Sequence, residues 1–160
     1  MTNRIETKRT IGPILVLGLS LLYGCGGPLG PFPGGVLEGK PARADPTWNG
    51  LGDSGICELE TNPADPYSVT VACTVIDGQL YVNAGGTEKR WAKNIVDDPN
   101  VRLRIDGEIY DLRGIRVQDP AEIARFGKAW TSQSFFRRDP AAYDEVWVFR
   151  LVPRPSKSPT

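Results

Sequence analysis

The chain has 160 residues, with 19 basic side chains, 19 acidic side chains and no histidine. The balanced charge gives no reason to expect a nucleic-acid partner, which would require a basic surface. The lack of histidine excludes histidine metal ligands and Ser–His or Cys–His catalytic pairs, and three cysteines are too few for a four-cysteine zinc site. We therefore expect no metal, and we expect a cofactor to carry any chemistry.

Residues 1–24 predict a targeting segment. Three cations within the first nine residues precede an apolar run over 11–22, which is shorter than the about 20 residues that span a membrane. Tyr23, Gly24 and Cys25 follow the run. This arrangement resembles a bacterial lipoprotein signal, which implies that residues 1–24 are removed and that Cys25 carries acyl chains such as palmitate. The alternative is an uncleaved anchor in which Cys25 occurs by chance.

The same resemblance implies a location in the cell envelope. Gly26 follows Cys25, whereas an aspartate at this position favours retention in the inner membrane in proteobacterial lipoproteins. We therefore expect the chain to be anchored in the outer membrane, with its domain facing the periplasm.

Residues 25–54 are rich in glycine and proline. Such a composition buries too little apolar surface to offset chain entropy, so we expect a disordered or extended tether. Trp48 and Leu51 are expected to begin the packing of the folded domain.

Residues 55–152 have the length of one domain, and 153–160 form a polar tail that is expected to fray. Alternating apolar and polar residues predict strands in this domain. They are expected over Gly55 to Glu60, Tyr67 to Ile76, Leu80 to Val82, Val101 to Ile105, Glu108 to Val117 and Val146 to Leu151. Asp77-Gly78 and Asp106-Gly107 are typical two-residue hairpin turns. At Gly114 the apolar face changes side, which indicates a bulge or a barrel corner.

Two or three helices are expected between these strands. Thr87 is the expected cap of a helix that ends at Asp98-Pro99. Asp119-Pro120 predicts a second helix that reaches about Ala129, and Asp139-Pro140 predicts a short third helix through Tyr143. The fold class is therefore α+β, a six-stranded antiparallel split β-barrel with two or three helices. Closure of the barrel would remove the exposed edges that an open sheet would leave.

A candidate anion site lies at the start of the first helix. The preceding turn and the first helical turn present Gly85, Gly86, Lys89, Arg90 and Trp91 together. Free backbone N–H groups and two cations favour an anion there. Each residue also has a structural explanation, because Trp91 can be a core residue and the two cations can form a solvated face.

The stretch from Leu80 to Val117 resembles the flavin- and deazaflavin-binding split β-barrel superfamily, which includes pyridoxamine phosphate oxidases and deazaflavin-dependent nitroreductases. The resemblance covers roughly Ile56 to Leu151. It is carried by a strand that ends in glycine, by Lys89, Trp91 and Asn94, by the run from Asp98 to Leu103, and by a tight turn before the long strand Glu108 to Val117.

The resemblance implies a bound FMN or deazaflavin, with Asn94 as a further cofactor-binding residue unless it only bonds a neighbouring loop. It also implies nitroreductase-like oxidoreductase activity and a homodimer, since family members commonly bind the cofactor between two subunits. Arg137 and Arg138 could close over an anionic ligand. Four aromatic residues are expected in the core or in a dimer contact: Trp130, Phe135, Phe136 and Trp147.

Two function classes stay open. In the family a basic, glycine-bearing segment before the second long strand helps to hold the cofactor's phosphates, but here Glu60 to Pro66 is acidic and rich in proline. The helix start favours a flavin-binding envelope oxidoreductase, whose site is then partly degenerate. The acidic loop favours a non-enzymatic lipoprotein that uses the barrel as a scaffold for a small ligand or a protein partner.

Cys57 and Cys73 lie on the first two predicted strands of the domain. A turn near Ala64 or Asp65 places them close to opposite each other across the hairpin. A disulfide would persist in an oxidising envelope. The alternative is a pair of buried, reduced cysteines, because a slip of one residue in register would turn them to opposite faces.

Overall fold

The computed structural model describes residues 26–43, 48 and 54–154. The predicted signal peptide, Cys25, Leu51 and the end of the tail lie outside these residues. The strands are β1 (Lys40–Ala42), β2 (Ser54–Thr61), β3 (Tyr67–Ile76), β4 (Gln79–Ala84), β5 (Asn100–Ile105), β6 (Glu108–Arg116) and β7 (Trp147–Pro153). The helices are α1 (Arg90–Asp97) and α2 (Pro120–Ser132).

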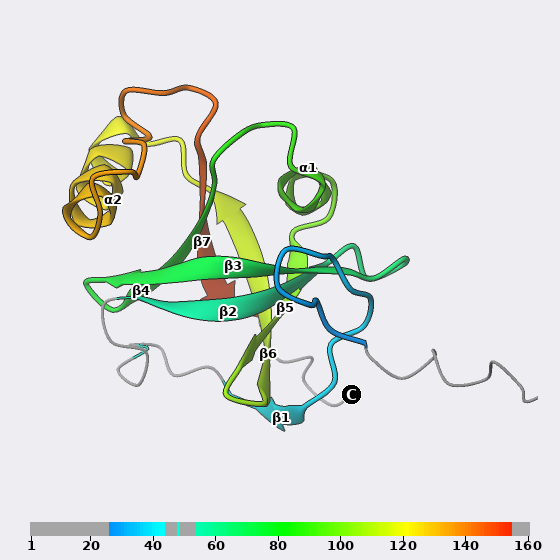
Figure 1. The fold of residues 1–160 in the computed structure, drawn as a ribbon. Helices are drawn as coiled ribbons and strands as arrows, with labels where there is room; N and C mark the ends of the chain where they lie inside the picture. Colours follow the sequence, from blue (N-terminus) through cyan, green and yellow to red (C-terminus); the bar gives the residue numbers. More distant parts are fainter. Residues whose placement is uncertain (1–25, 44–47, 49–53, 155–160) are drawn as a thin grey trace, which may run out of the picture.

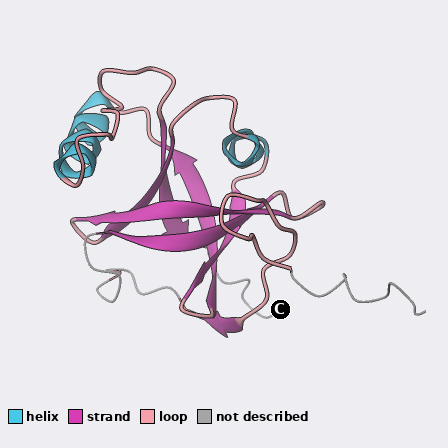
Figure 2. Cartoon of the chain, viewed as in Figure 1, coloured by secondary structure: helices cyan, strands magenta, loops and turns pink. Residues whose placement is uncertain are grey.

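Six of the strands form a closed antiparallel barrel. Around the barrel the order is β2, β3, β4, β7, β6 and β5, and β5 pairs again with β2. Strand β1 is an addition that pairs in parallel with β6. Both helices lie on the same side of the barrel, and β1 lies on the opposite side beside the hairpin of β5 and β6 (Figures 1 and 2). The predicted α+β fold with a six-stranded antiparallel barrel is confirmed.

Gly114 marks a corner of the barrel rather than a bulge. Strand β6 pairs with β5 from Glu108 to Arg113 and with β7 from Leu112 to Arg116, and both registers are continuous. A Cβ atom on Gly114 would lie 2.6 Å from Cγ2 of Ile95. Glycine is therefore needed at this position because α1 packs directly against the strand.

The barrel interior holds the main core. Alternate residues of the strands point inward, as the period of two requires, and α1 adds the buried side chains of Trp91, Ala92 and Ile95. A second, smaller cluster lies under α2, where Phe126 packs on Tyr81. The Tyr81 hydroxyl donates a hydrogen bond to Glu122 on the same helix (2.8 Å). Burial raises the pKa of Tyr81, the Glu122 carboxylate adds to the rise, and Arg125 opposes it.

The helix boundaries confirm one expected cap and correct two other expectations. Asp119 accepts a hydrogen bond from the backbone N–H of Ala121 at the start of α2, as predicted. The first helix begins after Lys89, not after Thr87, and no side chain caps it. The predicted third helix is a turn, in which the Ala142 N–H bonds the carbonyl of Asp139. A single turn of helix has too few hydrogen bonds to offset the cost of ordering it.

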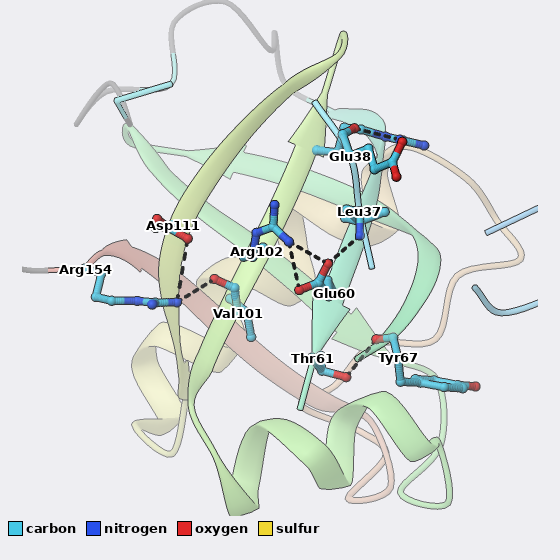
Figure 3. Close-up of polar contacts among 10 residues, drawn as sticks. Leu37, Glu38, Glu60, Thr61, Tyr67, Val101, Arg102, Asp111 and Arg154 are labelled. Atoms are coloured by element: carbon cyan, nitrogen blue, oxygen red, sulfur yellow. Dashed lines mark hydrogen bonds and ion pairs between the residues drawn. The ribbon is translucent and has the colours of Figure 1, made fainter. Parts of the chain in front are cut away.

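The expectation of an unstructured tether is wrong for residues 26–43, which pack against the barrel. Glu60 is only 4% exposed on the outer wall of the barrel because Leu37 covers it. The Glu60 carboxylate accepts the backbone N–H of Leu37 and two hydrogen bonds from Arg102, at 3.0 and 3.2 Å (Figure 3). Gly34 also exchanges backbone hydrogen bonds with Ser68 of β3. Trp48 packs on Tyr110, as expected.

Close backbone contacts explain the glycines of this segment. A Cβ atom on Gly26 would lie 2.1 Å from the carbonyl oxygen of Val36, and one on Gly34 would lie 2.3 Å from the carbonyl carbon of Gly27. The segment therefore doubles back on itself, and glycine is required where its two arms touch.

The hairpin of β2 and β3 joins Cys57 to Cys73 in a disulfide. In its register Cys57 lies opposite Val71, so the two cysteines are diagonal neighbours on the inner face, with their Cα atoms 6.0 Å apart. Both are 1% exposed. The bridge therefore lies in the barrel core.

We predict that the Glu60→Ala substitution destabilises the fold by about 3 kcal/mol, the low end for breaking a buried ion pair, because Arg102 is partly exposed. Equilibrium unfolding in urea measures this loss, and faster hydrogen exchange at the Leu37 amide should accompany it. Glu58→Ala is the matched control, since Glu58 pairs with Arg104 on the same two strands but is more exposed. An equal loss in both variants would contradict a special role for Glu60.

We predict that the purified protein contains no free thiol at Cys57 or Cys73. Closing a loop of this length stabilises a fold by about 3 kcal/mol in the chain-entropy model, so a Cys57→Ala, Cys73→Ala variant should unfold at lower urea concentration. Intact mass after alkylation under denaturing, non-reducing conditions is the direct measurement. Two alkylated cysteines at these positions would rule out the bridge.

Candidate functional site

A groove of about 360 Å³ lies along β3, next to the start of α1. Its lining includes Val69 and Val71, which pack against the barrel core, and Thr70 and Ala72 of the outer face. One end of this face is covered by residues 26–36, through the bridge of Gly34 to Ser68. The other end is covered by α2, where Ile76 joins the cluster around Phe126. Between the two covers, Thr70 and Ala72 line the groove with small side chains. We call this hollow the β3 groove.

Four of the six predicted cofactor residues line the β3 groove. Gly85, Lys89, Arg90 and Trp91 meet there because they belong to one turn and the first turn of one helix. The first N–H groups of a helix have no acceptor within it, so the backbone here can also bind an anion. Gly86 and Asn94 are not among the lining residues.

The two cations at the helix start differ in their surroundings. Arg90 pairs with Asp65 of the acidic loop (3.3 Å), and its guanidinium lies 4.4 Å from the centre of the Tyr67 ring. Lys89 is exposed and forms no ion pair with any residue that the structure describes. Lys89 is therefore available to a ligand, whereas a ligand must compete with Asp65 for Arg90.

Trp91 and Asn94 have structural contacts of their own. Trp91 is 7% exposed, and its ring packs 5.8 Å from that of Phe149 in the barrel core. The Asn94 amide donates to the Thr61 hydroxyl (2.9 Å), which donates to the carbonyl of Tyr67 (3.1 Å). Asn94 thus fastens α1 to the turn between β2 and β3. Asn94 therefore has a structural role of the kind expected if it does not bind a cofactor.

A second hollow of about 340 Å³ continues the groove toward α2. It shares Ala72, Asn83 and Gly85 with the β3 groove and adds Arg137 and Arg138. Arg137 lies 3.8 Å from the centre of the Trp130 ring, and Arg138 pairs with Glu145. Both cations therefore border this second hollow and not the β3 groove itself.

The expectation that Phe135 and Phe136 are core residues is wrong. Their side chains are 106% and 98% exposed. They follow α2 in a loop whose hydrogen bonds are local ones between Ser134 and Arg137. A dimer contact at these residues stays a prediction.

Several lining residues could not be found from sequence reasoning. Tyr67, Asn83 and the pair Gly30-Pro31 come from three distant parts of the chain. The available signal was the run of small outward residues on β3, which comprises Ser68, Thr70, Ala72 and Thr74. Small outward side chains favour either a covering element or a groove.

Within the part of the chain that the structure describes, there is no cluster of metal-ligating side chains and no helix that could span a membrane. Over residues 26–43, 48 and 54–154, no group of three or more metal-ligating side chains comes together. Neither α1 nor α2 has the length and apolar character needed to cross a bilayer.

Comparisons with known proteins support the fold. No protein-family model matches the sequence, and no curated protein matches it. Among solved structures, the chain is similar to the "Putative Pyridoxamine 5'-phosphate oxidase" of Listeria innocua, with a TM-score of 0.50 and 15% identity over 62% of this chain and 83% of that one. It is also similar to a conserved hypothetical protein of Mycobacterium tuberculosis (TM-score 0.49, 20% identity, 62% and 72% covered). A third similar structure is General Stress Protein 26 of Bacillus anthracis, with a TM-score of 0.48 and 17% identity over 64% of this chain and 82% of that one. At such identities the likeness to the first structure shows a shared split-barrel fold alone.

Proposed function

We propose that the β3 groove binds a flavin-type cofactor, FMN or a deazaflavin, and that the protein is a membrane-anchored envelope oxidoreductase of the nitroreductase-like kind. The observation that carries this proposal is the meeting of Lys89 with the open backbone of Gly85 in this groove. A Cβ atom on Gly85 would have no atom within 4 Å apart from its own chain neighbours. The backbone there is accessible to a phosphate group, and Lys89 supplies the opposite charge.

The size and chemistry of the groove fit this proposal. Its volume falls in the range of about 300–1,000 Å³ that is usual for small-molecule sites. Tyr67 offers an aromatic ring, and Asn83 offers an amide that can bond a polar ring edge. A flavin supplies hydride or single-electron transfer when it is bound. The chain's own residues would bind its phosphate and orient its ring.

An alternative function is that of a scaffold without a cofactor. It is favoured by the pairing of Arg90 with Asp65, which neutralises one of the two cations at the helix start. Trp91 also buries most of its side chain against Phe149 in the core, so little of it is left to contact a ligand in the groove. In this alternative the groove takes a small neutral ligand or a segment of a protein partner.

The proposed anchor is a lipid on Cys25, which precedes the first described residue. It is supported by the apolar run over 11–22 and by Gly24 and Cys25, which lie just after that run. Stable attachment requires more than one acyl chain, since a single chain gives only marginal binding. We propose that the anchored domain faces the periplasm from the outer membrane.

We predict that the purified protein binds FMN or a deazaflavin and that Lys89→Ala with Arg90→Ala weakens binding more than tenfold. Each charge-assisted hydrogen bond to the phosphate contributes about 1.5–3 kcal/mol. Visible absorption before and after addition of cofactor detects binding, and titration calorimetry measures the affinities.

Two further variants sharpen this experiment. Lys93→Ala is the matched control, because Lys93 is an exposed lysine of the same helix that does not line the groove. Asp65→Asn should strengthen binding by a factor of about 1.4 to 5, since an exposed ion pair is worth about 0.2–1 kcal/mol. If the parent protein binds neither cofactor, the scaffold function is favoured instead.

We predict that Cys25→Ser releases the protein from the membrane. The substitution removes the thiol that would carry the acyl chains and leaves the folded domain unchanged. Fractionation of cells into membrane and soluble pools measures the effect. A variant that stays in the membrane pellet as the parent does would show that Cys25 is not the anchor.

A further inference from the structure

Two large apolar side chains are exposed at the tip of the N-terminal segment. Leu29 is 69% exposed and Phe32 is 71% exposed. They lie on either side of a tight turn, with Gly30 and Pro31 between them. Single exposed apolar residues are common, but a neighbouring pair held at one tip is typical of a contact surface. We call residues 29–32 the apolar tip.

The apolar tip is held in place by its own backbone. The N–H groups of Leu29 and Phe32 each donate to the other residue's carbonyl, both at 3.0 Å. Gly30 takes a left-handed conformation (φ 57°) that this turn needs. Behind the tip, the contact of Gly34 with Gly27 and the bridge to Ser68 fasten the arms to the barrel. The two side chains therefore stay presented to their surroundings.

The tip also lies close to the proposed lipid anchor. Leu29 is only four positions along the chain from Cys25, a span of at most about 14 Å even for a fully extended chain. A lipid on Cys25 would therefore bring the tip to the surface of the bilayer. An aliphatic and an aromatic side chain are well suited to the boundary between headgroups and acyl chains.

We propose that the apolar tip inserts into the membrane that holds the anchor, and so fixes how the barrel stands on it. This inference rests on the proposed lipid at Cys25. The partner that the apolar tip contacts is the lipid bilayer. The tip is a second membrane contact that adds orientation to attachment. Since Gly30 and Pro31 also line the β3 groove, that groove opens beside the membrane surface.

The rival surface is the loop that carries Phe135 and Phe136, which are even more exposed. It follows α2, more than a hundred residues from Cys25 along the chain. In Figure 1 the orange segment that contains it is well separated from the blue N-terminal segment. The position of the anchor therefore favours the apolar tip.

Spin labelling of the full lipidated chain in vesicles tests the inference. The label is attached at Pro31→Cys, a position that leaves both Leu29 and Phe32 in place. The label reacts only there, because Cys57 and Cys73 are joined in a disulfide and Cys25 is acylated. Matched labels at Ile56→Cys and Phe135→Cys report on two other exposed positions. Power saturation with dissolved oxygen and with a water-soluble nickel complex measures how deep each label lies.

We expect the label at position 31 to lose collisions with nickel and to gain collisions with oxygen, while the labels at 56 and 135 stay accessible to nickel. Adding Leu29→Ser and Phe32→Ser should restore nickel access at position 31, with no change in vesicle attachment or in the unfolding midpoint. A protein that stays with the vesicles while its label at 31 is as accessible to nickel as that at 56 overturns the inference alone. So does protection at position 135 instead. Loss of the protein from the vesicles overturns the anchor, and the inference with it.

Discussion

The Glu60 carboxylate is the contact on which the arrangement around the groove depends. It lies on the outer wall of the barrel, where a charged group would ordinarily face water, yet it is 4% exposed. Burial of a carboxylate requires donors, and Arg102 on the neighbouring strand and the backbone N–H of Leu37 supply them (Figure 3). The hydrogen bond from Leu37 thereby fastens the N-terminal segment to the barrel. The same segment contributes Gly30 and Pro31 to one wall of the β3 groove, so a contact on β2 shapes a site on β3.

The barrel could be predicted from the sequence because its strands alternate strictly and its turns are short. Strand β3 begins and ends where expected, and Asp119 caps α2. The order of residues 26–43 could not be predicted, because a linker and a doubled-back segment share the same composition of glycine and proline. Gly26 and Gly34 are required only because other backbone atoms lie against them, and no pattern along the chain shows such a contact. The start of α1 also differs from the prediction. Thr87 is a good cap by residue type, but Lys89 occupies the cap position and the helix begins at Arg90.

Some residues of the candidate site could likewise be predicted from the sequence, and others could not. Gly85, Lys89 and Arg90 could be found because they are neighbours in one turn and one helix. Tyr67 and Asn83 could not, since only the closure of the sheet brings them to the groove. The acidic loop departs from the family pattern, and the structure shows one consequence of that departure: Asp65 pairs with Arg90. That pairing makes Lys89 the cation on which an anionic ligand would depend.

The doubled-back segment also changes what a lipid on Cys25 would do. A flexible tether of 30 residues would let the domain wander about 30 Å from its anchor and turn freely. Instead, Gly26 already touches Val36, and Leu37 is fixed to Glu60. Residues packed in this way begin one position after the proposed lipid, so a lipid there would leave the domain little freedom to rotate. A domain held so closely would present one face to the bilayer, and that face would include the apolar tip. The β3 groove, which shares two residues with the tip, would then receive ligands at the membrane surface more readily than from the bulk periplasm.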